Sequence, residues 1–262
     1  MKGESNLKNV LLTISFDGSK FHGWQIQNNA FTVQECFQKA LFSILKENVD
    51  IKACSRTDSG VHAKMFCISL KYNNPISPFR LQGALNHFLP ESIAVIDARE
   101  VPENFHARYS CLGKEYIYKI HNHKVRNPFS VGRELHFWHK IDENQLDRAC
   151  KYYIGKHDFT SFCTQDARKM LDMEREVFDA KFERFGDDLV FTVSANGFLY
   201  NMVRIMLGTL LKIQEGKINE DDIPSIIKAK DRSKAGVTVP PQGLYLNRVF
   251  YDLKDFWKVE IL

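Results

Sequence analysis

One stretch of eight residues combines side chains that could carry out nucleophilic chemistry: Arg56-Thr57-Asp58-Ser59-Gly60-Val61-His62-Ala63. A carboxylate nucleophile must be ionised, and a guanidinium two residues away would lower the pKa of Asp58. It must also be exposed on a firmly held loop, which Ser59-Gly60 can form because glycine tolerates positive φ. Asp-Ser-Gly is also an ordinary turn sequence. The stretch therefore predicts a catalytic Asp58 and leaves a purely structural turn as the alternative.

Length and composition are those of a globular protein. The chain has 262 residues, which is enough for one or two domains with a sizeable core. No run approaches the ~20 apolar residues of a membrane span. Residues 1–5 lack the apolar stretch of a signal peptide. We therefore expect a cytoplasmic protein.

The cysteines and histidines give little sign of a metal site. The six cysteines are scattered among apolar neighbours without a CxxC pair, which favours buried, reduced thiols. His121 and His123 could share one strand face, and His136 and His139 follow closely, but two ligands do not make a site. We expect no metal.

The charge distribution is more informative than the net charge. A net charge of +4 is explained as well by solvated lysines as by nucleic-acid binding. Six arginines, however, lie near loops or element ends, several of them beside aromatic residues: Arg56, Arg80, Arg108, Arg126, Arg168 and Arg204.

The first part of the chain has clear strand and helix signals. Thr32 and Glu35 form a capping box, and Ser77-Pro78 is typical of a helix start. The other expected elements follow from the spacing of apolar residues, which has a period of two in strands and of about 3.6 in helices. The expected elements are a strand over residues 10–16, a helix over 33–45, strands over 49–56 and 65–72, a helix over 78–88 and a strand over 93–101. This β-α-β-β-α-β order is ferredoxin-like and places Asp58 between the second and third strands.

The second part repeats this order with longer elements. Asp142 can cap a helix, and Gly186-Asp187-Asp188 can turn a hairpin. We expect a strand over residues 114–120, a helix after Asp142, hairpin strands over 176–185 and 189–195, helices over 198–213 and 221–229, and a strand over 244–251. A boundary near residues 102–106 gives an N-terminal half, 1–104, with the Asp58 loop and a C-terminal half, 105–262. The predicted class is α+β, with two ferredoxin-like halves that form a broad platform and leave a cleft suited to RNA.

Many short motifs then follow the order found in one family. The chain resembles tRNA pseudouridine synthases of the TruA type over roughly residues 9–252. The resemblance depends on Phe16-Asp17-Gly18-Ser19, Gly23-Trp24-Gln25, the eight residues around Asp58, Asn86 with Leu89-Pro90, Phe105-His106-Ala107-Arg108, Lys114-Glu115-Tyr116-Ile117-Tyr118, Asn201-Met202-Val203-Arg204 with Gly208, and Ala235-Gly236 with residues 240–246.

The resemblance implies both a fold and an activity. The fold would be one extended, mostly antiparallel sheet flanked by helices, with a central basic cleft, usually in a homodimer. The activity would be isomerisation of uridine to pseudouridine in the anticodon stem-loop of tRNA, commonly at positions 38 to 40. No cofactor is needed, because the reaction involves no redox change and no external group. The partner would be tRNA, without a membrane.

The resemblance also implies roles for four catalytic residues. Asp58 would be the catalytic carboxylate, as a nucleophile or as a base on the sugar. Arg56 would pair with Asp58 or hold a phosphate. Tyr116 would stack on the uracil, and its hydroxyl could move a proton; from the residues alone, a core aromatic is the alternative. Arg204 would pair with Asp58. Its position in an apolar helix segment favours a buried partner, and a surface arginine is the alternative.

Substrate contacts are expected from other loops. Our candidates are Trp24, Gln25, His22 and Arg108, while His62 is expected to pack the Asp58 loop. Phosphate contacts would supply most of the affinity and a steep salt dependence, and the target uridine must leave the helix stack.

Three alternatives stay open at this point. The chain could be a non-catalytic RNA-binding protein, although Asp58 would then repel phosphate. It could be a pseudouridine synthase for other RNA positions. It could also be a glycoside hydrolase, which would normally need a second carboxyl group that the sequence does not single out. The sequence has no phosphate-binding loop of the P-loop or dinucleotide type.

Overall fold

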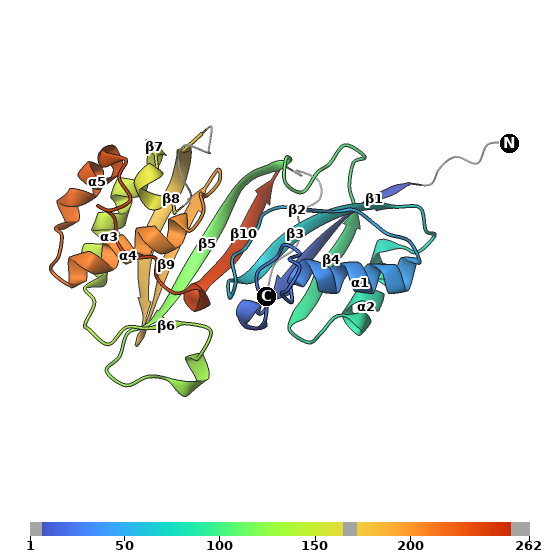
Figure 1. Ribbon diagram of the computed structural model, residues 1–262, viewed down its shortest axis with the longest axis horizontal. Coiled ribbons are helices and arrows are strands. Elements are labelled where there is room, and N and C mark those ends of the chain that lie inside the picture. Colours follow the sequence, from blue (N-terminus) through green and yellow to red (C-terminus); the bar gives the residue numbers. More distant parts are fainter. Residues whose placement is uncertain (1–6, 165–171, 253–262) are drawn as a thin grey trace.

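One continuous sheet runs the length of the molecule (Figure 1). The structure is a computed structural model that describes residues 7–164 and 172–252, so Arg168 lies outside the described residues. Within them, ten strands follow the order β4-β1-β3-β10-β5-β9-β8-β7, with β2 paired to β3 and β6 paired to β5.

The first half has the predicted order of elements. They are β1 (Lys8–Phe16), α1 (Val33–Leu45), β2 (Ile51–Ala53), β3 (His62–Tyr72), α2 (Pro78–Phe88) and β4 (Ile93–Glu100). The pairing β4-β1-β3-β2 is antiparallel throughout and is the ferredoxin-like arrangement. Helices α1 and α2 contact each other, and α2 contacts β4.

The second half repeats this pairing. Its main elements are β5 (Cys111–His121), α3 (Glu143–Cys150), β8 (Glu174–Phe185), β9 (Asp188–Ala195), α4 (Met202–Gln214) and β10 (Leu244–Tyr251). The neighbours β10-β5-β9-β8 match β4-β1-β3-β2 of the first half. Shorter elements are β6 (Leu135–His136), β7 (Gly155–Asp158) and α5 (Ile223–Ala229). The predicted pseudo-repeat and α+β class are therefore confirmed.

A short parallel pairing joins the two halves. Tyr245 and Leu246 of β10 pair with His62 and Ala63 at the start of β3, whereas further along β3 its partner is β2. The joint therefore lies where β3 leaves the Asp58 loop, so that loop sits between the halves. The division at residues 104/105 falls between β4 and β5 and stays a prediction.

Three local predictions needed correction. Helix α4 begins at Met202 rather than at residue 198, because Asn201 has the left-handed conformation (φ 63°), which a right-handed helix cannot include. Strand β2 covers only three residues, and β3 begins earlier than expected. Thr32 Oγ1 accepts from the Glu35 N–H (3.4 Å), but the Glu35 carboxylate pairs with Lys39 Nζ (2.6 Å).

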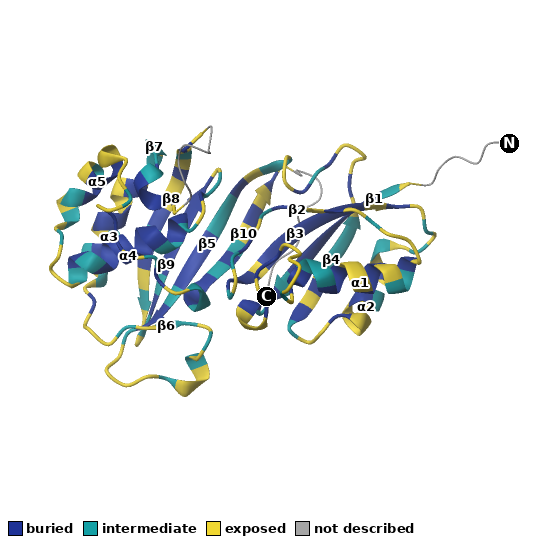
Figure 2. Cartoon of the chain, in the orientation of Figure 1, coloured by how far each residue is buried: buried dark blue, intermediate teal, exposed yellow. Residues whose placement is uncertain are grey.

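Buried side chains follow the strands and the inner faces of the helices, and the outer helix faces are exposed (Figure 2). All six cysteines are free and five are buried, as predicted. Burial raises the pKa of the Cys54 thiol to about 12, so this thiol is unreactive at neutral pH. None of the described helices has the length and apolar character needed to cross a membrane.

Candidate active site

A cavity of about 640 Å³ lies between the two halves, lined by the β2–β3 loop, by β5 and by residues 198–203. Its cationic lining residues are Lys52, Arg56, Arg108, Lys114 and Arg175. Asp58 is the only carboxylate among the described residues that line it. The predicted central basic cleft is therefore present, with one acidic group inside it.

The loop over residues 54–61, which we call the carboxylate loop, is held by the segment after β1. The Gly60 N–H donates to the Phe21 carbonyl (3.2 Å), and the Trp24 N–H donates to the Thr57 carbonyl (3.3 Å). Gly60 has φ 77°, which agrees with the prediction that Ser59-Gly60 forms a turn with a positive φ at the glycine. A Cβ on Gly23 would collide with the Thr57 carbonyl. Close backbone packing therefore fixes the position of Asp58.

Asp58 forms an ion pair with Arg204 across the joint. Arg204 Nη1 lies 3.3 Å from Asp58 Oδ2, and their side chains are 15% and 27% exposed. The guanidinium also donates to the Val239 carbonyl (2.7 Å) and to Asn201 Oδ1 (2.7 Å). These three partners fix the guanidinium next to the carboxylate. This agrees with the expectation that a charge in an apolar helix segment has a buried partner.

Burial raises the pKa of Asp58 above its ordinary value of 3.8, although Arg204 opposes this through its charge and hydrogen bond. We predicted that Arg56 would lower this pKa, and that prediction is wrong. Arg56 is exposed and lines the cavity, and no hydrogen bond or ion pair joins it to Asp58 in the described parts of the chain.

Tyr116 lies on β5 with only 7% of its surface exposed, and it lines the cavity. Its ring meets Phe198 edge to face, with centroids 5.1 Å apart. Burial raises the pKa of the Tyr116 hydroxyl well above its ordinary value, and the charge of Asp58 adds to this rise. The hydroxyl is therefore protonated at neutral pH and can donate a hydrogen bond.

The four predicted RNA contacts lie in different places. Gln25 and Arg108 are exposed and line the cavity, and the Arg108 guanidinium lies 5.9 Å from the Tyr109 ring centroid. His22 is exposed but is not among the cavity residues. Trp24 is 3% exposed and stacks on Phe66 with centroids 4.5 Å apart, so it mainly supports the cavity wall.

His62 has a packing environment, as expected. It is 2% exposed and stacks on Tyr245, with centroids 4.5 Å apart. Its Nδ1 accepts from the Gly18 N–H (3.0 Å), and burial lowers its pKa. The imidazole is therefore neutral and directed away from the cavity, where it joins the carboxylate loop to the turn after β1.

Sequence reasoning missed Asn201 and Arg175. Asn201 links Arg204 to Thr164 Oγ1 (2.9 Å) through its two amide atoms. The available signal was asparagine directly before an apolar helix, because asparagine tolerates the left-handed conformation better than most residues. Arg175 reaches the cavity from β8, and nothing in the local sequence distinguishes it from a surface arginine.

The described residues offer one group with metal-ligand geometry. His121, Glu134 and Asp188 bring ligand atoms within 4.8 Å of one another. His121 Nδ1 lies 2.8 Å from Asp188 Oδ1, and this hydrogen bond raises the pKa of His121. An ion pair therefore accounts for the contact of His121 with Asp188, whereas Glu134 Oε2 is buried without a hydrogen-bond partner among the described residues, and none of the three residues lines the cavity.

Comparison with known proteins identifies the class. A family model described as tRNA pseudouridine synthase matches residues 12–110 and 149–252. The chain belongs to this family. It is 43% identical over 245 residues to the tRNA pseudouridine synthase A of Thermoanaerobacter sp. (strain X514), covering 94% of this chain and 100% of that one. It is 42% identical over 246 residues to the same-named protein of Ruminiclostridium cellulolyticum, with the same shares covered.

Solved structures add only a distant likeness. The Cbf5-Nop10-Gar1 complex contains a chain that is 11% identical, with 92% of this chain and 59% of that chain covered and a TM-score of 0.38. An archaeal box H/ACA sRNP Nop10-Cbf5 complex gives 10% identity, shares of 86% and 59%, and a TM-score of 0.31. Scores this low carry no argument about the site.

Proposed function

We propose that this protein converts uridine to pseudouridine in the anticodon stem-loop of tRNA, at positions 38 to 40, with Asp58 as the catalytic carboxylate. The observation that carries the proposal is a cation-lined cavity in which Asp58 is the one carboxylate among the described lining residues, ion-paired at 3.3 Å with a fixed arginine. Family membership supports the reaction class. The position within the tRNA follows from the family resemblance.

The reaction is balanced without a cofactor. The N1–C1′ bond of uridine breaks, the uracil turns over, C5 bonds to the same C1′, and the C5 proton is lost while N1 gains one. Departure of uracil leaves C1′ electron-poor, as in glycoside cleavage. Asp58 would either attack C1′ or remove a proton from the sugar, and both roles need its ionised form.

The other cavity residues would position the substrate. Arg204 favours the ionised form of Asp58. Tyr116 lines the cavity with a protonated hydroxyl, and its ring would contact the turned-out uracil; stacking on a base contributes about 1–3 kcal/mol. Arg56 and Arg108 would bind the phosphates beside the flipped nucleotide. Gln25 is available for a polar contact, and Trp24 would support the wall.

Hydrolysis of a glycosidic bond is a weaker candidate. Such enzymes normally use two carboxyl groups that flank the bond. The cavity offers only Asp58 among its described residues. Non-catalytic RNA binding also fits less well, because a partly buried carboxylate in a basic cavity repels phosphate, and pure binding gives no reason to keep it there.

The test is tritium release from tRNA transcripts that carry C5-labelled uridine. We expect release to water, and we expect replacement of uridines 38 to 40 by cytidine to remove it. Release that persists after this replacement would favour a synthase for other positions. Tight, salt-sensitive binding without any release would favour the non-catalytic RNA-binding protein.

We also propose that the protein is a homodimer and that it acts in the cytoplasm. Sedimentation of the purified protein and fractionation of its source cells would check these two points. Neither result would change the proposal that the cavity is the active site.

Asn201→Ala is expected to lower kcat/KM about tenfold or more at neutral pH. The change removes a hydrogen bond to a charged group, which contributes about 1.5–3 kcal/mol, and frees Arg204 to leave Asp58. Lys46→Ala is the matched control, because Lys46 has a similar backbone conformation (φ 60°) at the end of α1. Equal activity of the two variants at equal Tm would refute a positioning role for Asn201.

A further inference from the structure

Residues 122–140, which we call the basic loop, join β5 to α3 and project from one end of the sheet (Figure 1). The loop contains four lysines and arginines, Lys124, Arg126, Arg133 and Lys140, and one acidic residue, Glu134. It lies between the two ranges matched by the family model, and none of its residues lines the cavity. The established site therefore leaves this strongly basic surface unexplained.

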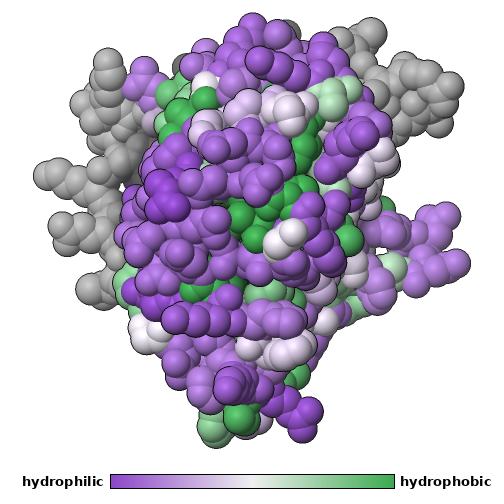
Figure 3. Space-filling view, turned by 90° about the vertical axis from the view of Figure 1, so that its left-hand side faces the viewer, coloured by the Kyte–Doolittle hydropathy of each residue, from purple (hydrophilic) through white to green (hydrophobic). Residues whose placement is uncertain are grey.

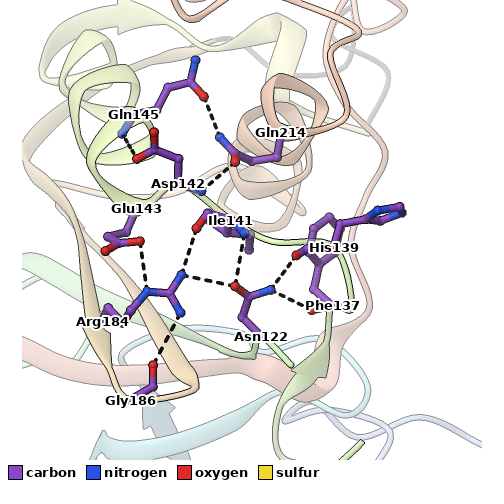
Figure 4. Close-up of polar contacts among 10 residues, drawn as sticks. All are labelled: Asn122, Phe137, His139, Ile141, Asp142, Glu143, Gln145, Arg184, Gly186 and Gln214. Carbon is purple, nitrogen blue, oxygen red and sulfur yellow. Dashed lines mark hydrogen bonds and ion pairs between the residues drawn. The ribbon is translucent and has the colours of Figure 1, made fainter. Parts of the chain in front are cut away.

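The Asn122 side chain closes the base of the basic loop, together with the pairing of β6 with the end of β5 (Figure 4). Its Nδ2 donates to the carbonyls of Phe137 (2.8 Å) and His139 (2.6 Å). Its Oδ1 accepts from the Ile141 N–H (3.2 Å) and from Arg184 Nη2 (3.2 Å). The outgoing and returning strands of the loop are thus tied to each other and to β8, so the loop is preorganised.

The basic loop is also fixed beside the active site. The Gly132 carbonyl lies 3.0 Å from His62 Nε2, and Tyr245 donates its hydroxyl proton to the Arg133 carbonyl (2.8 Å). Arg133 Nη2 forms an ion pair with Asp17 Oδ2 at 3.0 Å. The basic loop is therefore anchored on β3 and β10, the two strands that join the halves, close to the carboxylate loop in the chain.

The tip of the basic loop presents an aromatic ring among free cations. Asn127 Oδ1 accepts from the Phe129 N–H (3.0 Å) and caps a short 3-10 helix, Pro128–Ser130. This turn holds Phe129 with 88% of its surface exposed. Lys124 and Arg126 are exposed and have no ion pair or hydrogen bond within the described residues.

This combination favours RNA over a protein partner. Single-stranded RNA is bound by stacking of bases on exposed aromatic rings and by cations that contact the backbone. A protein partner would bind mainly through apolar side chains, and the loop also exposes Val125, Val131 and Trp138 (66%, 69% and 62%). The cations beside Phe129, which are unpaired within the described residues, nevertheless suit an RNA backbone better. Seen from the end that carries α3 and α5, the surface is mostly hydrophilic, and the hydrophobic side chains are confined to small areas, including the lower end where the loop projects (Figure 3).

We propose that the basic loop is a second RNA-binding surface, on which Phe129 stacks against an unpaired base of the tRNA and Lys124 and Arg126 bind phosphates. This inference rests on the proposed function, because that function makes RNA the ligand. The surface would add affinity outside the uridine cavity and would not enter the chemical step.

The test compares Phe129→Ala and the double variant K124A/R126A with wild type on a tRNA transcript. Phe129→Ala is expected to raise Kd about tenfold. K124A/R126A is expected to reduce the slope of log Kd against log salt by about one to two. The single-turnover rate at saturating enzyme is expected to stay unchanged for both. Phe79→Ala (Phe79 is 80% exposed on α2) and K228A/K234A are the matched controls.

The possible outcomes separate this proposal from the proposed function. Unchanged Kd and salt slope in an active enzyme would overturn the loop proposal and leave the function standing. Weakened tRNA binding by the loop variants, with no pseudouridine formed by wild type, would support the loop and overturn the function. A changed sedimentation mass of Phe129→Ala with unchanged Kd would show a protein contact and would also overturn the loop proposal.

Discussion

Asp58→Asn is expected to abolish pseudouridine formation while tRNA binding persists or tightens. Asparagine has nearly the same size and can still accept from Arg204, but it cannot attack C1′ or take a proton. Loss of the central catalytic group lowers kcat by on the order of 10⁴-fold or more. Asp58 is the only carboxylate among the described residues that line the cavity, beside five cations, so its removal also removes repulsion of phosphate. Tritium release and Kd for a tRNA transcript measure the two effects.

The matched control for this substitution is Asp158→Asn. Asp158 pairs with Lys230 at 2.8 Å, and its side chain is 25% exposed, close to the 27% of Asp58. Both substitutions therefore remove one paired, partly buried carboxylate, but only Asp58 lines the cavity. If Asp58→Asn kept as much activity as Asp158→Asn, the chemical role of Asp58 would have to be abandoned.

Much of the fold could be predicted from local patterns. Helix α2 and strand β10 have the predicted bounds, because Ser77-Pro78 starts the helix and alternating apolar residues mark the strand. The order of elements then gave both ferredoxin-like halves. The pairing of β10 with β3 could not be read locally, since only two residue pairs make it. The start of α4 was missed because a single backbone angle, at Asn201, decides it.

The site was predictable where a physical cost pointed to a partner. A charge at Arg204 in an apolar helix needed a counter-charge, and its partner Asp58 lies 146 residues away. Proximity in sequence was misleading at Arg56, which stands two residues from Asp58 yet does not pair with it. The direction of the Asp58 pKa depends on burial, and burial depends on the packing of both halves. No spacing rule contains that information.

Arg204→Met is expected to lower activity at neutral pH about a hundredfold and to move the acid limb of the pH profile to higher pH. Burial raises the pKa of Asp58, and Arg204 is the group that opposes this rise. Without it, the pKa rises further, so a smaller fraction of Asp58 is ionised at a given pH. A lost hydrogen bond to a charged group, about 1.5–3 kcal/mol, sets the magnitude. The measurement is kcat/KM against pH.

The pH profile distinguishes this effect from loss of the carboxylate itself. Activity of Arg204→Met should recover in part as pH rises, because Asp58 is still present and regains its charge, whereas Asp58→Asn should stay inactive at every pH. Arg204→Lys keeps the charge but loses the contacts to Val239 and Asn201, so its acid limb should move less. Arg99→Met is the control, since Arg99 pairs with Asp97 at 2.6 Å, the two side chains are exposed to a similar extent (21% and 26%), and neither residue lines the cavity. An unshifted acid limb in Arg204→Met would mean that Arg204 acts on the substrate and not through the ionisation of Asp58.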